Sequence, residues 1–474
     1  MTWPTVQTPP SPPDPRSGAG SGGPPAPAPT PAPPRFPETF TLVAAAVLGA
    51  VIVLAGLMLW QNRAPGDDVA ADATTTPTPT TATSTTPTTA EGSGTTATST
   101  LPTTTPTTAG AAPSSTIDPD GVQPIACPSG VEPVICDAAA YVQQARQRQL
   151  KEFPPVEVLT DTEFDQALLT DFETYRAELD DEGVLLSALG LLDPGTSLAD
   201  AYRDALEIGV VGFYDPETGR LVVRASADGT LGDLNLHMRQ TLVHELTHAL
   251  DDQWFELDRE NSADGDAEYG FTAVVEGNAR RVDQRWQDGL DPASRSQLEA
   301  ESMSALSADD LLRYFTLPPI LQQLQLSPYT DGLAYMQRLT ASGGEAAADA
   351  ALTSPPGTSE EILHPGLSRA ADPEITVPRP PAGGTVVDDG RLGELLVDQW
   401  LGSTAGDGWG GDRYVTWRDA SRSCVAVDLA ADTSDDLAQM QTAAQRWAAG
   451  TPADRTVTTA TVNGRSVLRA TGCA

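Results

Sequence analysis

The sequence predicts an α+β fold over residues 121–474 of the 474-residue chain. A β-hairpin is expected over 210–223, where two β-rich arms flank the turn sequence DPETG. A short strand is expected before it at 155–159, and the surrounding segments repeat apolar residues at helical spacing. The expected helices cover 138–150, 161–179, 238–256 and 268–288, and further helices fill 296–350.

A smaller α+β unit is expected at the C-terminal end. Pro-rich residues near 372–382 indicate a boundary, so the two predicted units are 121–371 and 372–474. The second unit combines one helix near 433–448 with several strands. These strands are expected at 413–417, at 424–428 and, as a pair, near 456–471.

The first 120 residues are not expected to form a globular unit. Residues 1–38 are rich in Pro, Gly and Ala, and residues 62–120 are rich in Thr and Pro. Neither stretch buries enough apolar area to offset its ordering entropy, so both are predicted to be disordered. The Thr/Pro-rich stretch is expected to serve as an extended stalk.

Between these stretches, residues 39–61 are predicted to form one transmembrane helix. Residues 40–60 carry no charge, and the run is long enough to span a bilayer, which needs about 20 residues. Its length and its Pro-rich, non-basic front favour a retained anchor over a cleaved signal peptide. The arginines before the span favour a cytoplasmic N-terminus, which makes this a single-pass protein of the cell membrane.

The four cysteines place the folded part outside the cell. Cys127, Cys136, Cys424 and Cys473 all follow the predicted span. An even number on one side is typical of disulfides in an oxidising compartment. We expect the pairs Cys127–Cys136 and Cys424–Cys473, because each lies within one local unit. A zinc site built from cysteines is disfavoured, since no Cys-x-x-Cys pair is present.

The charge balance excludes some partners. The formal net charge is −37, from 28 Lys and Arg against 65 Asp and Glu. Nucleic acid is therefore not expected as a partner, nor is polybasic attachment to anionic lipid. Lys151 is the only lysine, which is typical of GC-rich bacterial genomes. The oligomeric state is not indicated by the sequence.

The strongest motif lies in the predicted helix 238–256. His244 and His248, two of only four histidines, stand one helical turn apart and can meet one metal ion. Glu245 lies about 100° round the helix, where it can take a proton from a metal-bound water. Asp251 or Asp252 is expected to accept the second imidazole N–H. The opposite face is apolar, from Leu242, Leu246, Ala249 and Leu250.

A third metal ligand is expected from a carboxylate, because few histidines remain. Glu276 in the predicted helix 268–288 is the first candidate, and Asp266 is the alternative. The neighbouring Gly277 costs a helix about 1 kcal/mol relative to Ala. Close approach to the motif helix is the expected reason for it.

HELTHALDDQ followed by VVEGNA resembles the gluzincin type of zincin peptidases, around thermolysin-like and peptidase-MA-like domains. The resemblance implies a zincin-like domain, Zn²⁺ held by His244, His248 and Glu276, and Glu245 as general base. It also implies that the hairpin aligns an extended protein or peptide substrate. Thermolysin-like members place an aspartate four residues after the ligand glutamate. Here that position is Arg280, so the surroundings of the ligands must differ.

A downstream His or Tyr commonly stabilises the tetrahedral intermediate in gluzincins. His364, held before Pro365, is the first candidate, and Tyr329 is the second. The expected protein is thus a membrane-anchored, extracytoplasmic zinc metallopeptidase. The alternative is a catalytically silent surface module with a structural zinc. The intact Glu245 favours the enzyme, because a structural site does not need that carboxylate.

Overall fold

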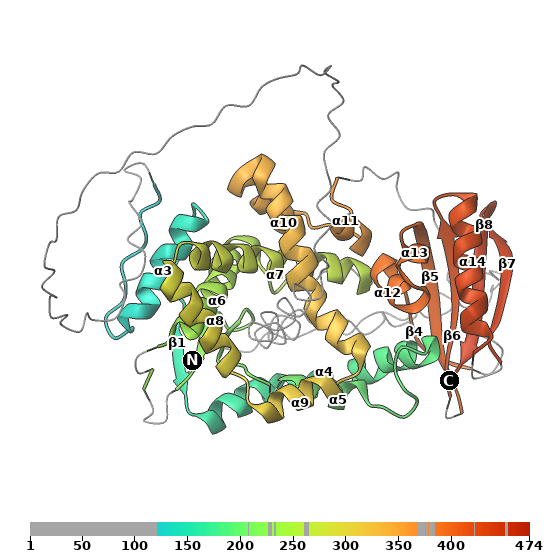
Figure 1. Cartoon of the computed structure of the whole chain (residues 1–474), viewed down its shortest axis with the longest axis horizontal. Helices are drawn as coiled ribbons and strands as arrows, with labels where there is room; N and C mark the ends of the chain where they lie inside the picture. The colour runs from blue at the N-terminus through green and yellow to red at the C-terminus, as the bar shows by residue number, and fades with distance from the viewer. Residues whose placement is uncertain are drawn as a thin grey trace, which may run out of the picture. The chain divides into compact units, whose positions relative to one another are not determined.

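The structure is a computed structural model of the chain (Figure 1). It describes residues 121–474 except for 207, 226–229, 232–233, 260–264, 367–374, 376–377, 379–383, 421 and 451–453. The predicted tail 1–38, transmembrane helix 39–61 and stalk 62–120 lie outside these residues, as does the predicted boundary at 371/372. Within the described ranges, no helix combines the length and apolarity that crossing a bilayer requires.

The described residues form a mixed α+β fold, as the sequence predicts. Three of the first four elements differ from the expected ranges mainly at their ends, and the fourth, α5, was not predicted. Helix α3 begins at Pro133, whose ring suits the first helical position, and it ends before Gln147, whose φ is 51°. The Arg148 N–H then bonds the Gln143 carbonyl at 3.0 Å, which closes the helix in a Schellman turn. These elements are α3 (Pro133–Ala145), β1 (Val156–Leu159), α4 (Asp161–Leu189) and α5 (Leu198–Leu206).

Helix α4 is longer than expected. It starts at a capping box between Thr160 and Glu163 and ends at Gly190, which has φ 84°. Its last turns place Leu185 and Leu189 in one apolar cluster with the C-terminal sheet. The apolar residues beyond position 179 thus extend the helix, because they have a second core to fill.

The predicted hairpin is confirmed. Strands β2 (Gly212–Asp215) and β3 (Arg220–Arg224) pair antiparallel, with Phe213 opposite Val222. The turn is held by Asp215, whose carboxylate accepts the N–H of Glu217 at 3.1 Å. Strand β1 pairs parallel with β3, so the order is β1-β3-β2 and β2 lies at an edge of this sheet.

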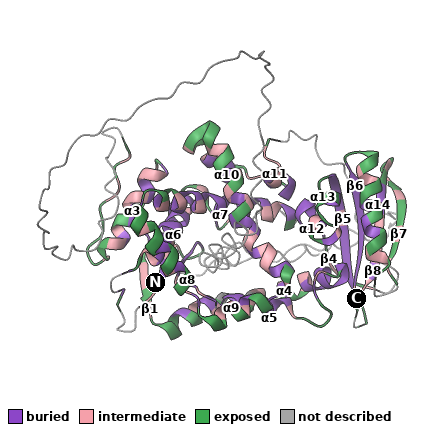
Figure 2. Ribbon diagram, in the orientation of Figure 1, coloured by how far each residue is buried: buried purple, intermediate pink, exposed green. Residues whose placement is uncertain are grey.

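Helices α6 (Leu236–Phe255) and α7 (Gly265–Asp288) carry the motif residues. The side chain of Asn235 caps α6 by accepting the Met238 N–H at 2.9 Å. Both helices are rich in buried residues (Figure 2). The predicted apolar face of α6 is confirmed, since its four residues are all buried: Leu242, Leu246, Ala249 and Leu250.

Three further helices follow, and the last crosses α7 closely. A Cβ on Gly277 would lie 2.2 Å from the backbone carbonyl of Gly332, and one on Gly332 would lie 2.0 Å from the Ala273 oxygen. The expectation that Gly277 faces the motif helix is therefore wrong, because the close neighbour is α10. Helix α10 also bends at Gly344, which has φ 61° and ψ −158°. These helices are α8 (Pro292–Ser304), α9 (Ala308–Thr316) and α10 (Pro319–Thr353).

The C-terminal residues form a five-stranded antiparallel sheet of order β4-β5-β6-β8-β7. Apolar residues of helix α14, including Met440 and Ala444, share one cluster with Val425 and Val427 of the sheet. The elements are α11 (Ser359–Leu363), β4 (Thr385–Gly390), α12 (Gly393–Leu401), α13 (Ser403–Gly406), β5 (Trp409–Asp419), β6 (Arg422–Ala431), α14 (Ser434–Ala448), β7 (Thr456–Val462) and β8 (Arg465–Cys473).

Both predicted disulfides are confirmed. Cys127 is bonded to Cys136, in the segment that leads into α3. Cys424 is bonded to Cys473, and these residues stand directly opposite each other on β6 and β8. Each bond therefore joins residues of one local unit, as the sequence suggests.

Candidate metal centre

Three side chains from α6 and α7 converge at one point. His244 Nε2 lies 3.2 Å from Glu276 Oε2, and His248 Nε2 lies 3.5 Å from the same oxygen. One ligand atom from each residue falls within 4.8 Å of the other two. All three are buried, and Glu276 has no exposed area. The helical spacing that suggested this group is borne out: the two imidazoles leave α6 on one side and meet a carboxylate of α7.

The donors fit a metal ion. Two imidazole nitrogens and one carboxylate oxygen are ligands that zinc uses, and three protein ligands leave a fourth tetrahedral position open. Within the described part of the chain, Glu276 Oε1 and His248 Nε2 are buried without a hydrogen-bond partner. Buried polar atoms normally have partners, and a metal ion bound to these two atoms would satisfy both.

The electrostatics of the group favour positive charge at its centre. Burial opposes the charge on Glu276, but the imidazoles of His248 and His244 outweigh it and lower its pKa to about 2. Burial likewise opposes a protonated His244, yet hydrogen bonds to Asp283 and Glu276 raise its pKa to about 10. A cation bound at His244 Nε2 would meet Glu276, one of the two carboxylates that favour this proton.

Asp283 orients the first imidazole. Its Oδ2 lies 2.9 Å from His244 Nδ1, which directs Nε2 toward Glu276. Asp283 is held in turn by Gln240 Nε2 at 3.1 Å and by the guanidinium of Arg280. Arg280, at the position where thermolysin-like enzymes have an aspartate, thus supports the aspartate that performs this role.

The sequence-based choice of Asp251 or Asp252 for this role is wrong. Asp251 binds the guanidinium of Arg146, and Asp252 accepts the hydroxyl of Tyr214 at 2.7 Å. Both carboxylates therefore have other partners, which come from the residue after α3 and from strand β2. Asp283 was missed, although it follows Glu276 by seven residues and so lies about two turns along the same face of α7.

Glu245 is the candidate base. It is buried, and its Oε2 accepts the backbone N–H of Tyr214 at 2.9 Å. In an antiparallel pair, alternate residues direct their N–H away from the partner strand, and Tyr214 uses this outward N–H for Glu245. Burial raises the pKa of Glu245, although His244 and His248 oppose the increase. The hairpin therefore fixes this carboxylate beside the two imidazoles.

Tyr329 of α10 belongs to the same site. Its ring stacks on His244, with centroids 6.0 Å apart and planes inclined by 21°. Burial raises the pKa of the Tyr329 hydroxyl well above 10, and Glu276 and Glu245 add to this increase. The hydroxyl therefore stays protonated and able to donate a hydrogen bond.

Two other candidates lie elsewhere. His364 Nε2 lies 2.7 Å from Glu394 Oε1 of α12, in a separate group with Asp407. Asp266 accepts the backbone N–H of Ser359 at 2.8 Å. Neither belongs to the group formed by His244, His248 and Glu276. The extended backbone before a proline suggested a fixed imidazole at His364, but it did not indicate which element that imidazole faces.

Comparison with known proteins adds no family: no family model, curated protein or solved structure matches this chain.

Proposed function

We propose that this protein is a zinc-dependent peptidase, and that His244, His248 and Glu276 hold its metal. The observation that carries the proposal is the buried carboxylate of Glu245, which follows His244 directly on α6 and accepts the N–H of Tyr214 at 2.9 Å. A buried base beside three convergent ligands is the arrangement that metal-assisted hydrolysis requires.

The ligand count separates this proposal from the alternative of a structural zinc. Structural zinc sites usually have four protein ligands, whereas catalytic sites keep one position open. Among the residues that the structure describes, this group offers three ligands. A structural site would also have no use for a buried carboxylate at position 245. Both observations support a catalytic role.

Each residue of the site has a separate role in the proposed hydrolysis. His244, His248 and Glu276 would hold the zinc ion, which would supply Lewis-acid polarisation of the scissile carbonyl and of the attacking water. Glu245 accepts the proton of the attacking water and delivers it to the leaving amine. Tyr329 donates a hydrogen bond to the carbonyl oxygen as it gains negative charge. Asp283 keeps the His244 imidazole oriented during these steps.

We also propose that the catalytic part lies outside the cell and is anchored by residues 39–61. The uncharged run at 40–60 supports the anchor, and the two disulfides support an oxidising compartment. Protease added to intact cells should remove the folded part beyond the stalk. Protection of this part in intact cells would overturn the orientation.

The activity is tested with the purified full-length protein and the variant Glu245→Gln. We expect the wild type to hold one zinc per chain and to cleave members of a peptide library. Glu245→Gln should keep its zinc and lose turnover, because it removes the base and no ligand. Glu256→Gln, at the exposed end of the same helix, is the matched control and should cleave like the wild type.

Two outcomes would contradict the proposal. Normal cleavage by Glu245→Gln would remove the base from the mechanism. A zinc-loaded wild type that cleaves no peptide would favour the structural-zinc alternative.

A further inference from the structure

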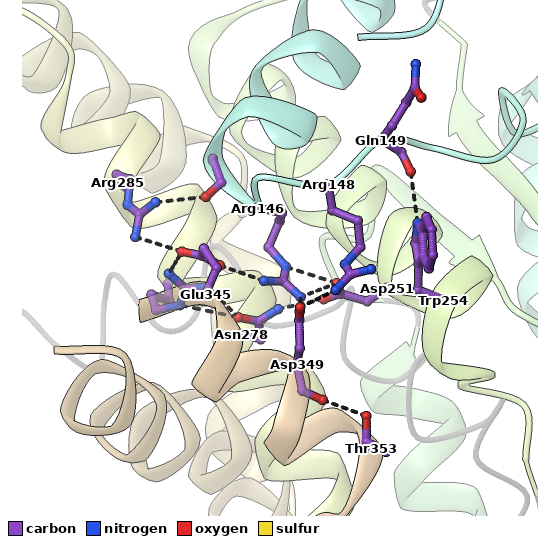
Figure 3. A network of polar contacts seen from close by, with 12 residues as sticks. Arg146, Arg148, Gln149, Asp251, Trp254, Asn278, Arg285, Glu345, Asp349 and Thr353 are labelled. Carbon is purple, nitrogen blue, oxygen red and sulfur yellow. Dashed lines mark hydrogen bonds and ion pairs between the residues drawn. The ribbon is translucent and has the colours of Figure 1, made fainter. Parts of the chain in front are cut away.

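A buried arginine joins the segment before the hairpin to the metal helix α6 and to helix α10. Arg146 follows α3 directly, and its side chain has no exposed area. Its Nε and Nη2 both donate to Asp251 Oδ1 of α6, at 3.0 and 2.8 Å. Its Nη1 donates to Glu345 Oε2 of α10 at 2.6 Å (Figure 3). One planar guanidinium thus bridges two helices that are far apart in sequence.

These contacts are part of a closed ring of side chains. Asp251 Oδ2 accepts the Asn278 amide of α7 at 2.6 Å, and Asn278 Oδ1 accepts Arg281 Nη2 at 2.7 Å. Arg281 forms a bidentate ion pair with Glu345, in which Nη1 donates to Oε1 and Nη2 donates to Oε2, each at 2.8 Å. Glu345 returns to Arg146. The ring therefore links the C-terminal end of α3 to α6, α7 and α10 through charged, buried bonds.

A bend in the backbone of α10 lies directly before the ring residue Glu345. Helix α10 bends at Gly344, and Glu345 is the first residue after the bend. Arg281 and Arg146 outweigh the cost of burying Glu345 and lower its pKa to about 2. The carboxylate is therefore charged in the folded protein, as the ring requires. A buried ionic network can fix the geometry of the helices it joins even where its net contribution to stability is small.

The ring lies next to the metal ligands. Asp251 follows His248 by three residues and Asn278 follows Glu276 by two, so each is within about one turn of a ligand on the same helix. The Asn278–Asp251 bond is thus a cross-link between α6 and α7 beside the point where His248 and Glu276 meet. Any change in the distance between the helices here changes the distance between these two ligands.

We propose that Arg146 is a positioning residue for the metal centre, which sets the separation of His248 and Glu276 through the ring Arg146–Asp251–Asn278–Arg281–Glu345. The inference rests on the proposed metal site. It makes the segment that follows the Cys127–Cys136 disulfide part of the support of the catalytic centre, although this segment supplies no ligand.

The test measures zinc affinity by chelator competition on the full chain, with the visible spectrum of the Co²⁺-loaded protein as a second readout. Arg146→Lys keeps the charge but cannot bond Asp251 and Glu345 with one planar fork. We expect its zinc affinity to fall about tenfold, the lower end of the effect of losing a ligand's support. The Co²⁺ bands should change in intensity, because the ligand geometry changes.

A second variant, Asn278→Ala, cuts the cross-link and leaves every charge of the ring in place. It should lower zinc affinity to a similar degree, and it keeps the inference testable if Arg146→Lys does not fold. Arg469→Lys is the matched control. Arg469 forms a bidentate ion pair with the buried Asp428 in the C-terminal sheet. This variant therefore loses an arginine contact to a buried carboxylate, as Arg146→Lys does, but away from the metal helices. Its zinc affinity and Co²⁺ spectrum should match the wild type.

Different results would overturn the proposed metal site and the proposed role of Arg146. A wild type that binds no zinc would overturn the proposed metal site, and the inference with it. A wild type that binds zinc, with equal affinity in Arg146→Lys and Asn278→Ala, would overturn the inference alone. Equal weakening in Arg469→Lys would also overturn it, because the loss would then reflect general destabilisation.

Discussion

Asp283 and His244 lie 2.9 Å apart, carboxylate oxygen to Nδ1, and this contact joins α7 to α6 beside the proposed metal ligands. Because Nδ1 faces Asp283, the other ring nitrogen, Nε2, faces Glu276 and is the atom that would bind the proposed metal. Glu276 and Asp283 come from one face of α7. A single helix therefore supplies both the proposed third ligand, Glu276, and the carboxylate that orients His244.

Replacing Asp283 with Asn should weaken zinc binding about 10- to 100-fold, because the amide lacks the charge that makes the imidazole a stronger ligand. Chelator competition measures the change. Asp252→Asn is the control, since Asp252 accepts the Tyr214 hydroxyl and contacts no imidazole that the structure describes. Equal affinities in the two variants would remove Asp283 from the account.

Tyr329→Phe should retain zinc and lose about 10²–10³ in kcat, the usual effect of removing one donor to an oxyanion. Steady-state cleavage of a peptide identified in the library measures the loss. His364→Ala should cleave normally, because His364 contacts Glu394 in a separate group. A large loss in His364→Ala with none in Tyr329→Phe would reverse this assignment.

Gly277→Ala should destabilise the protein by about 1–3 kcal/mol, because the added methyl meets backbone that cannot yield without moving α10. Thermal unfolding measures the shift. Gly265→Ala is the matched control at the start of the same helix, where a Cβ would meet nothing within 4 Å. Equal melting temperatures for the two variants would show that α7 and α10 are not in close contact at Gly277.

The stability of the fold should depend on Glu345 in acid. Arg281 and Arg146 hold its pKa at about 2, below the usual 4.5. A lowered folded-state pKa contributes stability above the unfolded value, and this contribution is lost as pH falls from about 4.5 toward about 2. Glu345→Gln should therefore be less stable than the wild type near neutral pH, with a gap that narrows over this range. Denaturant unfolding at several pH values measures the gap, and a constant gap would contradict the assignment.

Much of the fold is predictable from local patterns. The hairpin follows from its turn residues, the motif helix from its apolar spacing, and the strand pair that carries Cys424 and Cys473 from alternation. The ends of α3 and α4 were less predictable, because they depend on a Schellman turn at Gln147 and on a distant core. Tertiary contacts decide where these helices stop.

In the site, too, local patterns predict some features and tertiary contacts decide the others. The spacing of His244 and His248 places both imidazoles on one side of α6, and Glu276 was the first candidate for the third ligand. Asp283 and Arg146 were not predicted, because they contact the ligands or their neighbours through helix crossings that no local pattern encodes. Tyr329 was named only as the second candidate after His364, because the sequence does not show which of the two lies near the ligands. The same crossing explains Gly277, which a sequence argument assigned to the wrong neighbour.

The central claim is that His244, His248 and Glu276 together hold one zinc ion. The most direct test is the zinc content per chain of the purified full-length wild type and of Glu276→Ala, by elemental analysis after dialysis. Asp266→Asn serves as the control, because Asp266 bonds Ser359 outside the site. We predict one zinc in the wild type and in Asp266→Asn, and none in Glu276→Ala. Full zinc retention in Glu276→Ala, or none in the wild type, would contradict the account.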